Sequence, residues 1–191
     1  MSFNCQGVKW ETKGISLLSK SLRGNSALTT LNLSRCELGL ESLIDIAGVL
    51  LHNHTLKSID LSHNKMNDKA ARAIGGSLKE NTSLSSLNCF NTGLTTEGAR
   101  YLLEGVKSSD NCFNVNLASN KIGDAAMSIV SEWISRSLTI KTLDLSKNQI
   151  SKEGAKAIAP GLGASLSLVS LSLACNNISR DGAKEIATVL K

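Results

Sequence analysis

Hydrophobic and polar positions along the chain recur with a period of 28 residues. Each copy opens on an apolar residue, passes two variable positions to Leu-x-Leu or a close variant, and then usually reaches an Asn at position nine and Leu, Ile or Met at position eleven. The opening residues of successive copies are Leu28, Leu56, Leu84, Cys112, Ile140 and Leu168. A fixed period of this length predicts a solenoid of stacked units.

Within each copy the hydrophobic spacing changes once. Apolar residues at positions four and six, such as Leu143 and Leu145, alternate with variable ones, which predicts a short half-buried strand. From about position thirteen the spacing becomes helical, at i, i+3, i+4 and i+7. The run Ala155, Ile158, Ala159 and Leu162 is matched by Ala183, Ile186, Ala187 and Leu190. The glycines before such runs (Gly98, Gly154 and Gly182) are expected to let the helix pack close to the strand.

Stacking of these units also predicts a shape. Neighbouring strands sit about 4.8 Å apart, whereas packed helices need about 8–10 Å, so the strand side must be the inner face of an arc. Right-handed crossovers through the helices make the strands parallel. The expected fold class is therefore α/β, a solenoid in the form of a horseshoe segment, with parallel strands on the concave face and helices on the convex face.

The repeat accounts for the whole chain as one domain, 1–191. The expected division is a degenerate unit 1–27, full units 28–55, 56–83, 84–111, 112–139 and 140–167, and a truncated unit 168–191. Solenoid ends normally carry polar caps, and the end near Lys191 has no obvious one, so either the array is longer or another molecule covers it. Pro160 removes one helical hydrogen bond and is expected to kink or shorten its helix.

The phrase Leu-x-x-Leu-x-Leu-x-x-Asn-x-Ile, followed by Gly-Ala-x-x-Ile-Ala-x-x-Leu, resembles the ribonuclease-inhibitor-like class of leucine-rich repeats. Within this class, the repeat sequence is most similar to the repeat arrays of NOD-like receptors. The nucleotide-binding domain of those receptors has no counterpart here. The resemblance covers six consecutive units in register. It implies a curved protein-binding surface and leaves the ligand unnamed.

The Asn at position nine is expected to bond buried backbone groups in the turn that leaves each strand. Asn64, Asn120, Asn148 and Asn176 occupy this position. Cys36 and Thr92 replace it in two units and offer weaker bonding.

The five cysteines follow the repeat rather than a disulfide spacing. Cys5, Cys36, Cys89 and Cys112 fall at inward positions, and Cys175 faces outward. Buried free thiols fit a reducing compartment, and the N-terminus lacks the profile of a signal peptide. We therefore expect five free thiols and a cytoplasmic protein, or one in the host cytosol if the chain is a secreted effector.

Motifs for chemistry are missing from the sequence. No phosphate-binding glycine loop opens a helix. His52, His54 and His63 could suggest a metal site with Cys36, but the two ends of a strand separate them, so solvated histidines are expected. Cys175 lacks a neighbouring histidine. The sequence therefore predicts no enzyme activity, no cofactor and no metal.

Charge and hydropathy limit the classes of binding partner that the sequence predicts. The net charge of +5 is spread among acidic residues, and aromatic residues make up only 3% of the chain, which argues against nucleic acid. No apolar run is long enough for a membrane span. A protein partner is expected, with self-association through uncapped solenoid ends as a further hypothesis.

Outward positions three, five and seven form a grid on the strand face, in which hydroxyl and amide groups dominate. Phe90 interrupts this grid, either as a binding anchor or as a cover for the turn at Thr92. The predicted partner-binding residues are Asn32, Asp60, Asn88, Phe90, Asn116, Asp144 and Phe113. On the helix side, four apolar residues occupy positions that are usually polar and suggest a second docking surface: Ile44, Leu51, Tyr101 and Ile129.

The leading functional hypothesis is a non-enzymatic protein-protein interaction module that binds its partner on the concave face. One alternative is a regulator of an enzyme, as a GTPase-activating or inhibitor-type repeat array. Of the position-five residues, only Asp60 and Asp144 are acidic, which ranks this alternative second. The other alternative is a self-assembling structural repeat protein.

Overall fold

The computed structural model describes residues 1–109 and 111–190, in which strands and helices alternate along the chain. The strands are β1 (Ser2–Asn4), β2 (Thr30–Asn32), β3 (Ser58–Asp60), β4 (Ser86–Asn88), β5 (Asn114–Asn116), β6 (Thr142–Asp144) and β7 (Ser170–Ser172). The helices are α1 (Thr12–Arg23), α2 (Leu40–His52), α3 (Asp68–Glu80), α4 (Thr96–Ser109), a 3₁₀ turn η1 (Asp124–Ala126), α5 (Met127–Arg136), α6 (Lys152–Ala164) and α7 (Arg180–Val189).

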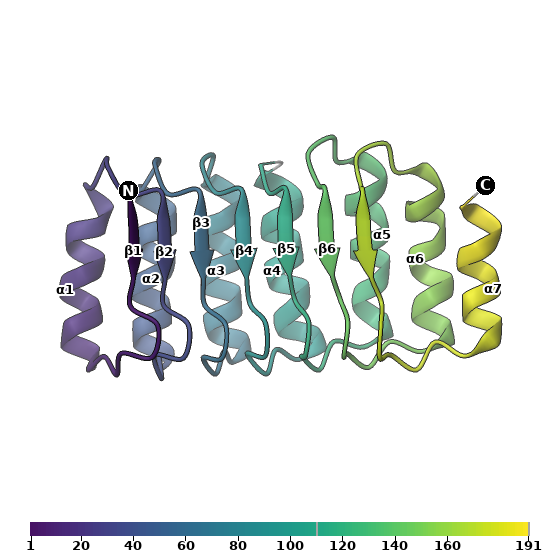
Figure 1. Ribbon diagram of the computed structural model, residues 1–191, viewed down its shortest axis with the longest axis horizontal. Coiled ribbons are helices and arrows are strands. Elements are labelled where there is room, and N and C mark those ends of the chain that lie inside the picture. Colours follow the sequence, from purple (N-terminus) through teal and green to yellow (C-terminus); the bar gives the residue numbers. More distant parts are fainter. Residues whose placement is uncertain (110, 191) are drawn as a thin grey trace.

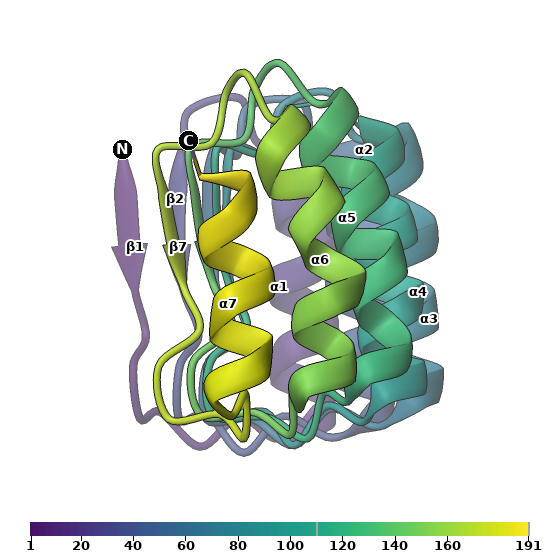
Figure 2. The same ribbon diagram turned by 90° about the vertical axis from the view of Figure 1, so that its right-hand side faces the viewer.

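All seven strands form one parallel sheet in the order of the sequence, β1 to β7. The register between neighbours is constant, since Leu31 pairs with Ile59 and Ile59 with Leu87, each 28 residues on. Figure 1 shows the strands side by side in front of the helices that connect them. Figure 2 shows that the sheet and the helices form two separate layers. The predicted fold class, a leucine-rich-repeat α/β horseshoe segment, is confirmed.

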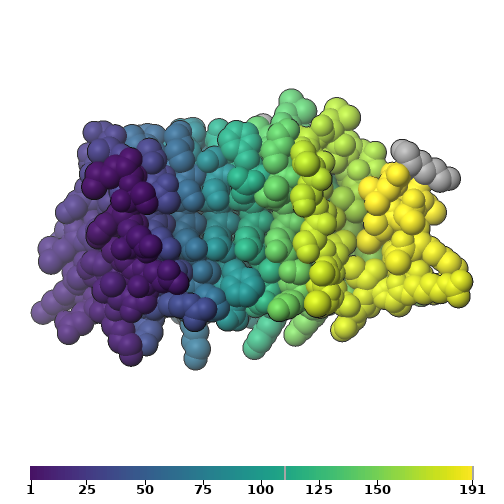
Figure 3. Space-filling view, viewed as in Figure 1, coloured from purple at the N-terminus to yellow at the C-terminus, as the bar shows by residue number. Residues whose placement is uncertain are grey.

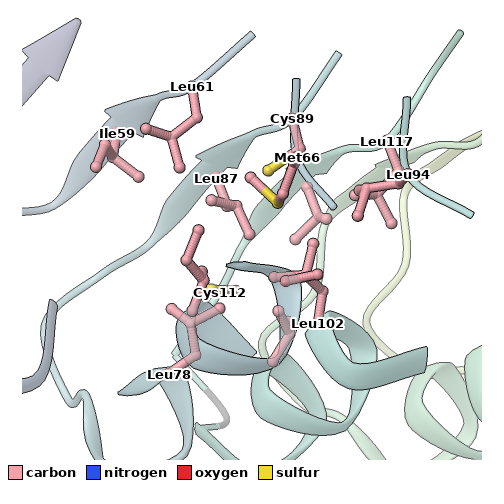
Figure 4. Packing of buried hydrophobic residues seen from close by; sticks show 14 of the residues in the cluster. Ile59, Leu61, Met66, Leu78, Leu87, Cys89, Leu94, Leu102, Cys112 and Leu117 are labelled. Atoms are coloured by element: carbon pink, nitrogen blue, oxygen red, sulfur yellow. The ribbon is translucent and has the colours of Figure 1, made fainter. Parts of the chain in front are cut away.

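The hydrophobic core fills the space between the two layers. Leu87 of β4 and Cys89, which follows this strand, pack with helix residues such as Leu78 and Leu102, and all four side chains are almost inaccessible to solvent (Figure 4). Burying one leucine of this kind contributes about 1.5–3 kcal/mol. Because the units between residues 28 and 167 contribute the same positions to this core, the two layers stay together along this part of the array.

The turn that leaves each strand has a left-handed backbone at position eight. Six non-glycine residues there have φ between 51° and 59°: Arg35, His63, Asn91, Ser119, Lys147 and Cys175. Such a conformation costs about 1–2 kcal/mol per residue. The Asn at the next position holds the turn in place.

Asn64 illustrates how this Asn acts. Its amide donates to the carbonyls of Leu33 and Leu61 at 2.8 and 2.9 Å, and its Oδ1 accepts the N–H groups of Cys36 and Leu38 at 3.0 and 3.1 Å. The side chain is buried and joins two neighbouring units. The expectation that the position-nine Asn bonds buried backbone groups is therefore confirmed for this residue.

The two substitutes at position nine keep part of this bonding. The Thr92 hydroxyl donates to the carbonyl of Cys89 at 3.0 Å, and the Cys36 thiol donates to the carbonyl of Cys5 at 3.0 Å. Unlike the amide of Asn64, each substitute has a single donor. Weaker tethering of these two turns therefore follows from the chemistry of the side chains.

The glycines before the helical runs leave room for neighbouring groups. A Cβ atom on Gly154 would collide with the side chains of Asp124 and Ile150, and one on Gly182 would press on Ala155 and the backbone of Lys152. The glycines thus make room for the preceding unit and for the residue that follows the strand of their own unit, Ile150 or Ile178. The expected close packing on the strand itself stays a prediction.

Pro160 does not shorten its helix, contrary to one of the two expected outcomes. The helix α6 is as long as α2 and α3, at 13 residues, and continues through Pro160 to Ala164. The hydroxyl of Ser131, on α5, accepts the N–H of Gly161 at 2.9 Å. A neighbouring helix therefore bonds the backbone at the proline.

Both ends of the described array expose apolar side chains. At the C-terminal end the exposed fractions are 89% for Leu166, 79% for Val169 and 65% for Leu190. At the N-terminal end Phe3 and Leu17 are exposed. The expected stop at Lys191 lies outside the described residues. Within the described part of the chain, no helix is long and apolar enough to cross a membrane.

Candidate functional site on the strand face

The outward side of the sheet is covered by no other element of the described chain, as Figure 3 shows from the strand side. Its side chains alternate with the buried core positions, because successive residues of a strand point to opposite faces. The position-five residues Asn32, Asp60, Asn88, Asn116 and Asp144 are all partly exposed there. The structure therefore brings five of the predicted site residues together in one row across β2 to β6.

Each side chain of this row also has a structural role that the sequence reasoning missed. Its Oδ1 accepts the backbone N–H two residues further on, at 2.8–3.0 Å, and so supports the end of its own strand. The signal was present in the sequence, since Asn and Asp favour this local bond where a chain turns. One oxygen of each side chain is thereby used, and the second polar atom remains for other contacts.

The two carboxylates of the row differ in how this second atom is used. Asp60 Oδ2 accepts the amide of Asn88 in the next unit at 3.0 Å. The residue in the same place after Asp144 is Ser172, whose side chain is shorter. Among residues 1–109 and 111–190, no hydrogen bond reaches Asp144 Oδ2.

A shallow hollow of about 310 Å³ lies in the strand face over β4 to β7. Its polar lining consists of Ser86, Asn114, Asn116, Thr142, Asp144, Ser170 and Ser172. Within this lining Asp144 has the sole charged side chain. The hollow is therefore a hydrogen-bonding depression with one negative charge.

The two phenylalanines of the predicted site lie at opposite ends of the strands. Phe90 follows β4 and is half-buried, and its ring meets that of His63 edge-on with 5.1 Å between centroids. Phe113 precedes β5 and is 42% exposed. The structure therefore does not bring the two rings together. Phe90 lies at the carboxyl ends of the strands and Phe113 at their amino ends, with the row of amides and carboxylates between them.

His63 belongs to a polar cluster at the edge where Phe90 lies. Its Nε2 is 3.1 Å from Nη2 of Arg35, and its Nδ1 is 3.0 Å from Nδ2 of Asn91. These three residues occupy position eight of successive units. The side chain of His63 is thus engaged by its neighbours on both sides. His52 is the last residue of α2.

The second docking surface that was expected on the helix side is incomplete. Ile44 and Leu51 are exposed, but Ile129 is 9% exposed and belongs to the core. Tyr101 is half-buried, with the guanidinium of Arg72 at 5.5 Å from its ring centroid. The assignment of Ile129 to a surface was wrong, because α5 lies so that this residue faces inward.

The cysteines are placed as the repeat predicted. Cys5, Cys36, Cys89 and Cys112 are buried, Cys175 is exposed, and all five are free thiols. Burial raises the pKa of Cys89 to about 12 and that of Cys112 to about 11. A thiol of such high pKa is a poor nucleophile at neutral pH.

The fold and this site together define a solenoid of leucine-rich repeats. A family model described as Leucine Rich repeat matches residues 24–47, 52–75, 136–159 and 164–187, just over half of the chain. The chain belongs to the leucine-rich repeat family. No curated protein sequence matches it significantly.

Solved structures with the same fold include two from the tropomodulin and leiomodin group. The tropomodulin C-terminal domain of Caenorhabditis elegans is 14% identical, with a TM-score of 0.65, and the match covers 80% of this chain and 92% of that one. Leiomodin-1 Actin-Binding Site 2 is 16% identical, with a TM-score of 0.54, and the match covers 90% and 84% of the two chains. At these identities the similarity concerns the fold.

Proposed function

We propose that this chain is a non-enzymatic protein-protein interaction module that binds its partner on the concave strand face. The observation that carries the proposal is the uncovered row from Asn32 to Asp144, whose polar side chains are partly exposed and lie in register. A partner that supplied matching hydrogen bonds would contact several units at once. Membership of the leucine-rich repeat family supports the class of function.

Phe90 and Phe113 suit the role of anchors at the edges of this surface. Interfaces are enriched in aromatic side chains, and a few such residues carry most of the binding free energy. Since the two rings lie at opposite ends of the strands, a partner that contacts both must extend along the full length of the strands. The proposed binding residues are therefore Asn32, Asp60, Asn88, Phe90, Asn116, Asp144 and Phe113.

The test begins with affinity capture from the native lysate, followed by mass spectrometry and calorimetry on the captured protein. Actin is the first defined candidate to add, because one of the similar structures is Leiomodin-1 Actin-Binding Site 2. Phe90→Ala and Asp144→Lys should each weaken binding, by about 2 kcal/mol where the side chain fills a pocket of the partner. Melting curves serve as the check of the fold: Phe90→Ala should stay close to the wild type, whereas Asp144→Lys should lose a small part of its stability, because the N–H of Ser146 loses its side-chain partner.

Lys156→Glu is the matched control, because Lys156 is exposed on α6 at the opposite side of the molecule. It should leave the affinity within about twofold, as expected for a charge outside the interface. If Lys156→Glu weakens binding and the two strand-face variants do not, the helix face is the working surface and the assigned site is wrong.

Self-assembly is a second candidate, favoured by the exposed apolar residues at both ends of the array. The edge strands β1 and β7 each have one hydrogen-bonding side without a neighbour in the described chain. Head-to-tail contacts between such ends would produce open filaments. Mass measurement by light scattering over a hundredfold range of concentration tests it, and a constant monomeric mass would exclude it.

A further inference from the structure

We propose that the hollow over β4 to β7 is a subsite for one cationic side chain of the partner, with Asp144 as its counter-charge. This inference rests on the proposed function, because it names the chemistry that the concave face would recognise. The hollow has a volume of about 310 Å³, which accommodates a guanidinium or ammonium group with its methylene stem. This volume lies at the small end of the range for ligand pockets, about 300–1,000 Å³.

The carboxylate of Asp144 is prepared for such a contact. Its Oδ1 accepts the N–H of Ser146 at 2.9 Å, which fixes the orientation of the group. Its Oδ2 receives no hydrogen bond from residues 1–109 or 111–190, and Asp144 is one of the residues that line the hollow. A charge-assisted hydrogen bond to this oxygen would be about twice as strong as one between neutral groups.

Asp60 shows why the subsite lies at Asp144 and not at the other carboxylate of the row. The amide of Asn88, one unit further on, occupies Asp60 Oδ2 at 3.0 Å. At Asp144 the equivalent residue is Ser172, which is too short to make the same bond. A difference of one side chain between units thus leaves one carboxylate occupied and the other open.

The remaining lining favours a group with several donors. Ser86, Ser170, Ser172 and Asn116, with hydroxyl and amide groups, line the same hollow as the carboxylate. A guanidinium has five N–H donors in a fixed plane and no acceptor, so it can bond the carboxylate and neighbouring hydroxyl oxygens together. Arginine is therefore the side chain that fits the lining best.

Lysines at the two ends of β6 restrict the partner further. Lys141 precedes the strand and Lys147 follows it, and both are exposed. Each is three residues from Asp144, or about 10 Å along an extended chain. They repel a broadly basic surface, so the subsite is expected to receive a single cation with neutral or acidic residues around it.

The experiment uses defined probes, so that the partner need not be known. Nα-acetyl-arginine amide is titrated into ¹⁵N-labelled protein, and Nα-acetyl-citrulline amide, which has nearly the same shape and no charge, serves as its control. The arginine probe should give saturable shifts centred on the amides of Asn116, Asp144 and Ser172, with a dissociation constant in the order of millimolar. The citrulline probe should bind at least about tenfold more weakly.

Three variants complete the test. Asp144→Asn keeps an oxygen for the N–H of Ser146 but should lose at least about tenfold in affinity for the arginine probe. Asp60→Asn removes the same charge elsewhere in the row and should stay within about twofold, because that carboxylate is already bonded. Ser172→Asn should imitate Asn88, occupy Asp144 Oδ2 and weaken the probe by about fivefold or more.

Several outcomes would overturn the proposal: equal binding of both probes, unchanged affinity in Asp144→Asn, or shifts centred away from β5 to β7. The result is separable from that for the proposed function. If the captured partner depends on Phe90 while the arginine probe does not bind, the cation subsite alone is wrong. If the probe binds at Asp144 while neither strand-face variant affects the partner, the subsite exists and the proposed function is wrong.

Discussion

The junctions α3–α4 and α4–α5 differ sharply, although the strands in front of them pair identically. At α3–α4 the backbones touch: a Cβ on Gly75 would overlap the carbonyl of Tyr101, and one on Gly105 would overlap the backbone of Gly75. At α4–α5 the buried Trp133 of α5 and Lys107 of α4 line one hollow, and Lys107 bridges to Glu132 at 3.0 Å.

A hollow of about 310 Å³ lined by Lys107, Glu132, Trp133, Arg136 and Ser137 remains at the α4–α5 junction. The α5 helix is also short, at 10 residues, and begins after the 3₁₀ turn η1. In the sheet, nevertheless, β4 pairs with β5 in the same 28-residue register as everywhere else. The comparison teaches that backbone hydrogen bonds fix the strand spacing, whereas side chains decide the helix spacing unit by unit.

The largest effect is expected from truncating Trp133, the large buried side chain of α5 at the α4–α5 junction. Trp133→Ala should lower the free energy of unfolding by about 3–5 kcal/mol, since the indole is 2% exposed and its removal leaves a cavity. Chemical denaturation monitored by circular dichroism measures it. Trp10→Ala, at a half-buried site in the first unit, should cost clearly less. Equal losses would mean that Trp133 does not determine this junction.

The strand side should respond to loss of a position-nine Asn. Asn148→Leu should cost about 1–3 kcal/mol, because the carbonyls of Leu117 and Leu145 and the N–H of Ile122 lose a buried partner. Asn176→Leu is the control, since this Asn is half-exposed and water can replace its side chain. An unchanged denaturation midpoint in Asn148→Leu would show that the amide does not hold the turn.

At the α3–α4 junction, where the two backbones touch, even one added methyl group should be unfavourable. Gly105→Ala should destabilise by about 1–3 kcal/mol, because the methyl group forces α3 and α4 apart. Gly76→Ala, on α3 with open space around its Cβ position, should instead stabilise by about 0.5–1 kcal/mol through helix propensity. Thermal melts of the pair decide it, and stabilisation by both would contradict close backbone contact at Gly105.

The effect that is expected to be smallest near neutral pH is a dependence of stability on pH, which comes from a thiol buried behind the strands. Burial raises the pKa of Cys89 to about 12, with Asp60 adding to the shift, against about 8.5 for an unfolded thiol. The stability linked to this thiol is therefore complete below about pH 8.5 and is lost as pH rises toward 12. The loss should approach about 1.4 kcal/mol per pH unit once the unfolded thiol ionises.

Cys89→Ala should make this alkaline slope less steep, whatever its stability at neutral pH, while Cys112, whose pKa is raised to about 11, keeps part of the slope. Cys175→Ala, at an exposed thiol, should leave the slope unchanged. Urea denaturation at several pH values between 8 and about 11 measures both. An equally steep slope in Cys89→Ala would show that Cys89 is not the source.

The repeat by itself determined the parallel order of the strands, their register and the burial of Cys5, Cys36, Cys89 and Cys112. It could do so because backbone hydrogen bonding and the alternation of strand residues depend on position in the unit and little on the neighbouring side chain. The bonding of Asn64 to two units follows from the same regularity. The limits of the individual units stay a prediction.

The tertiary structure decided what depends on contact between units. The sequence placed Ile129 outside, but η1 and the short α5 bring it into the core. The sequence analysis also treated Asp60 and Asp144 as equivalent. In the structure Asn88, one unit after Asp60, donates to the carboxylate of Asp60, whereas Ser172, one unit after Asp144, leaves Oδ2 of Asp144 without a hydrogen bond from the described residues. Such contacts join residues 28 positions apart, and the geometry between them exists only once the units are stacked.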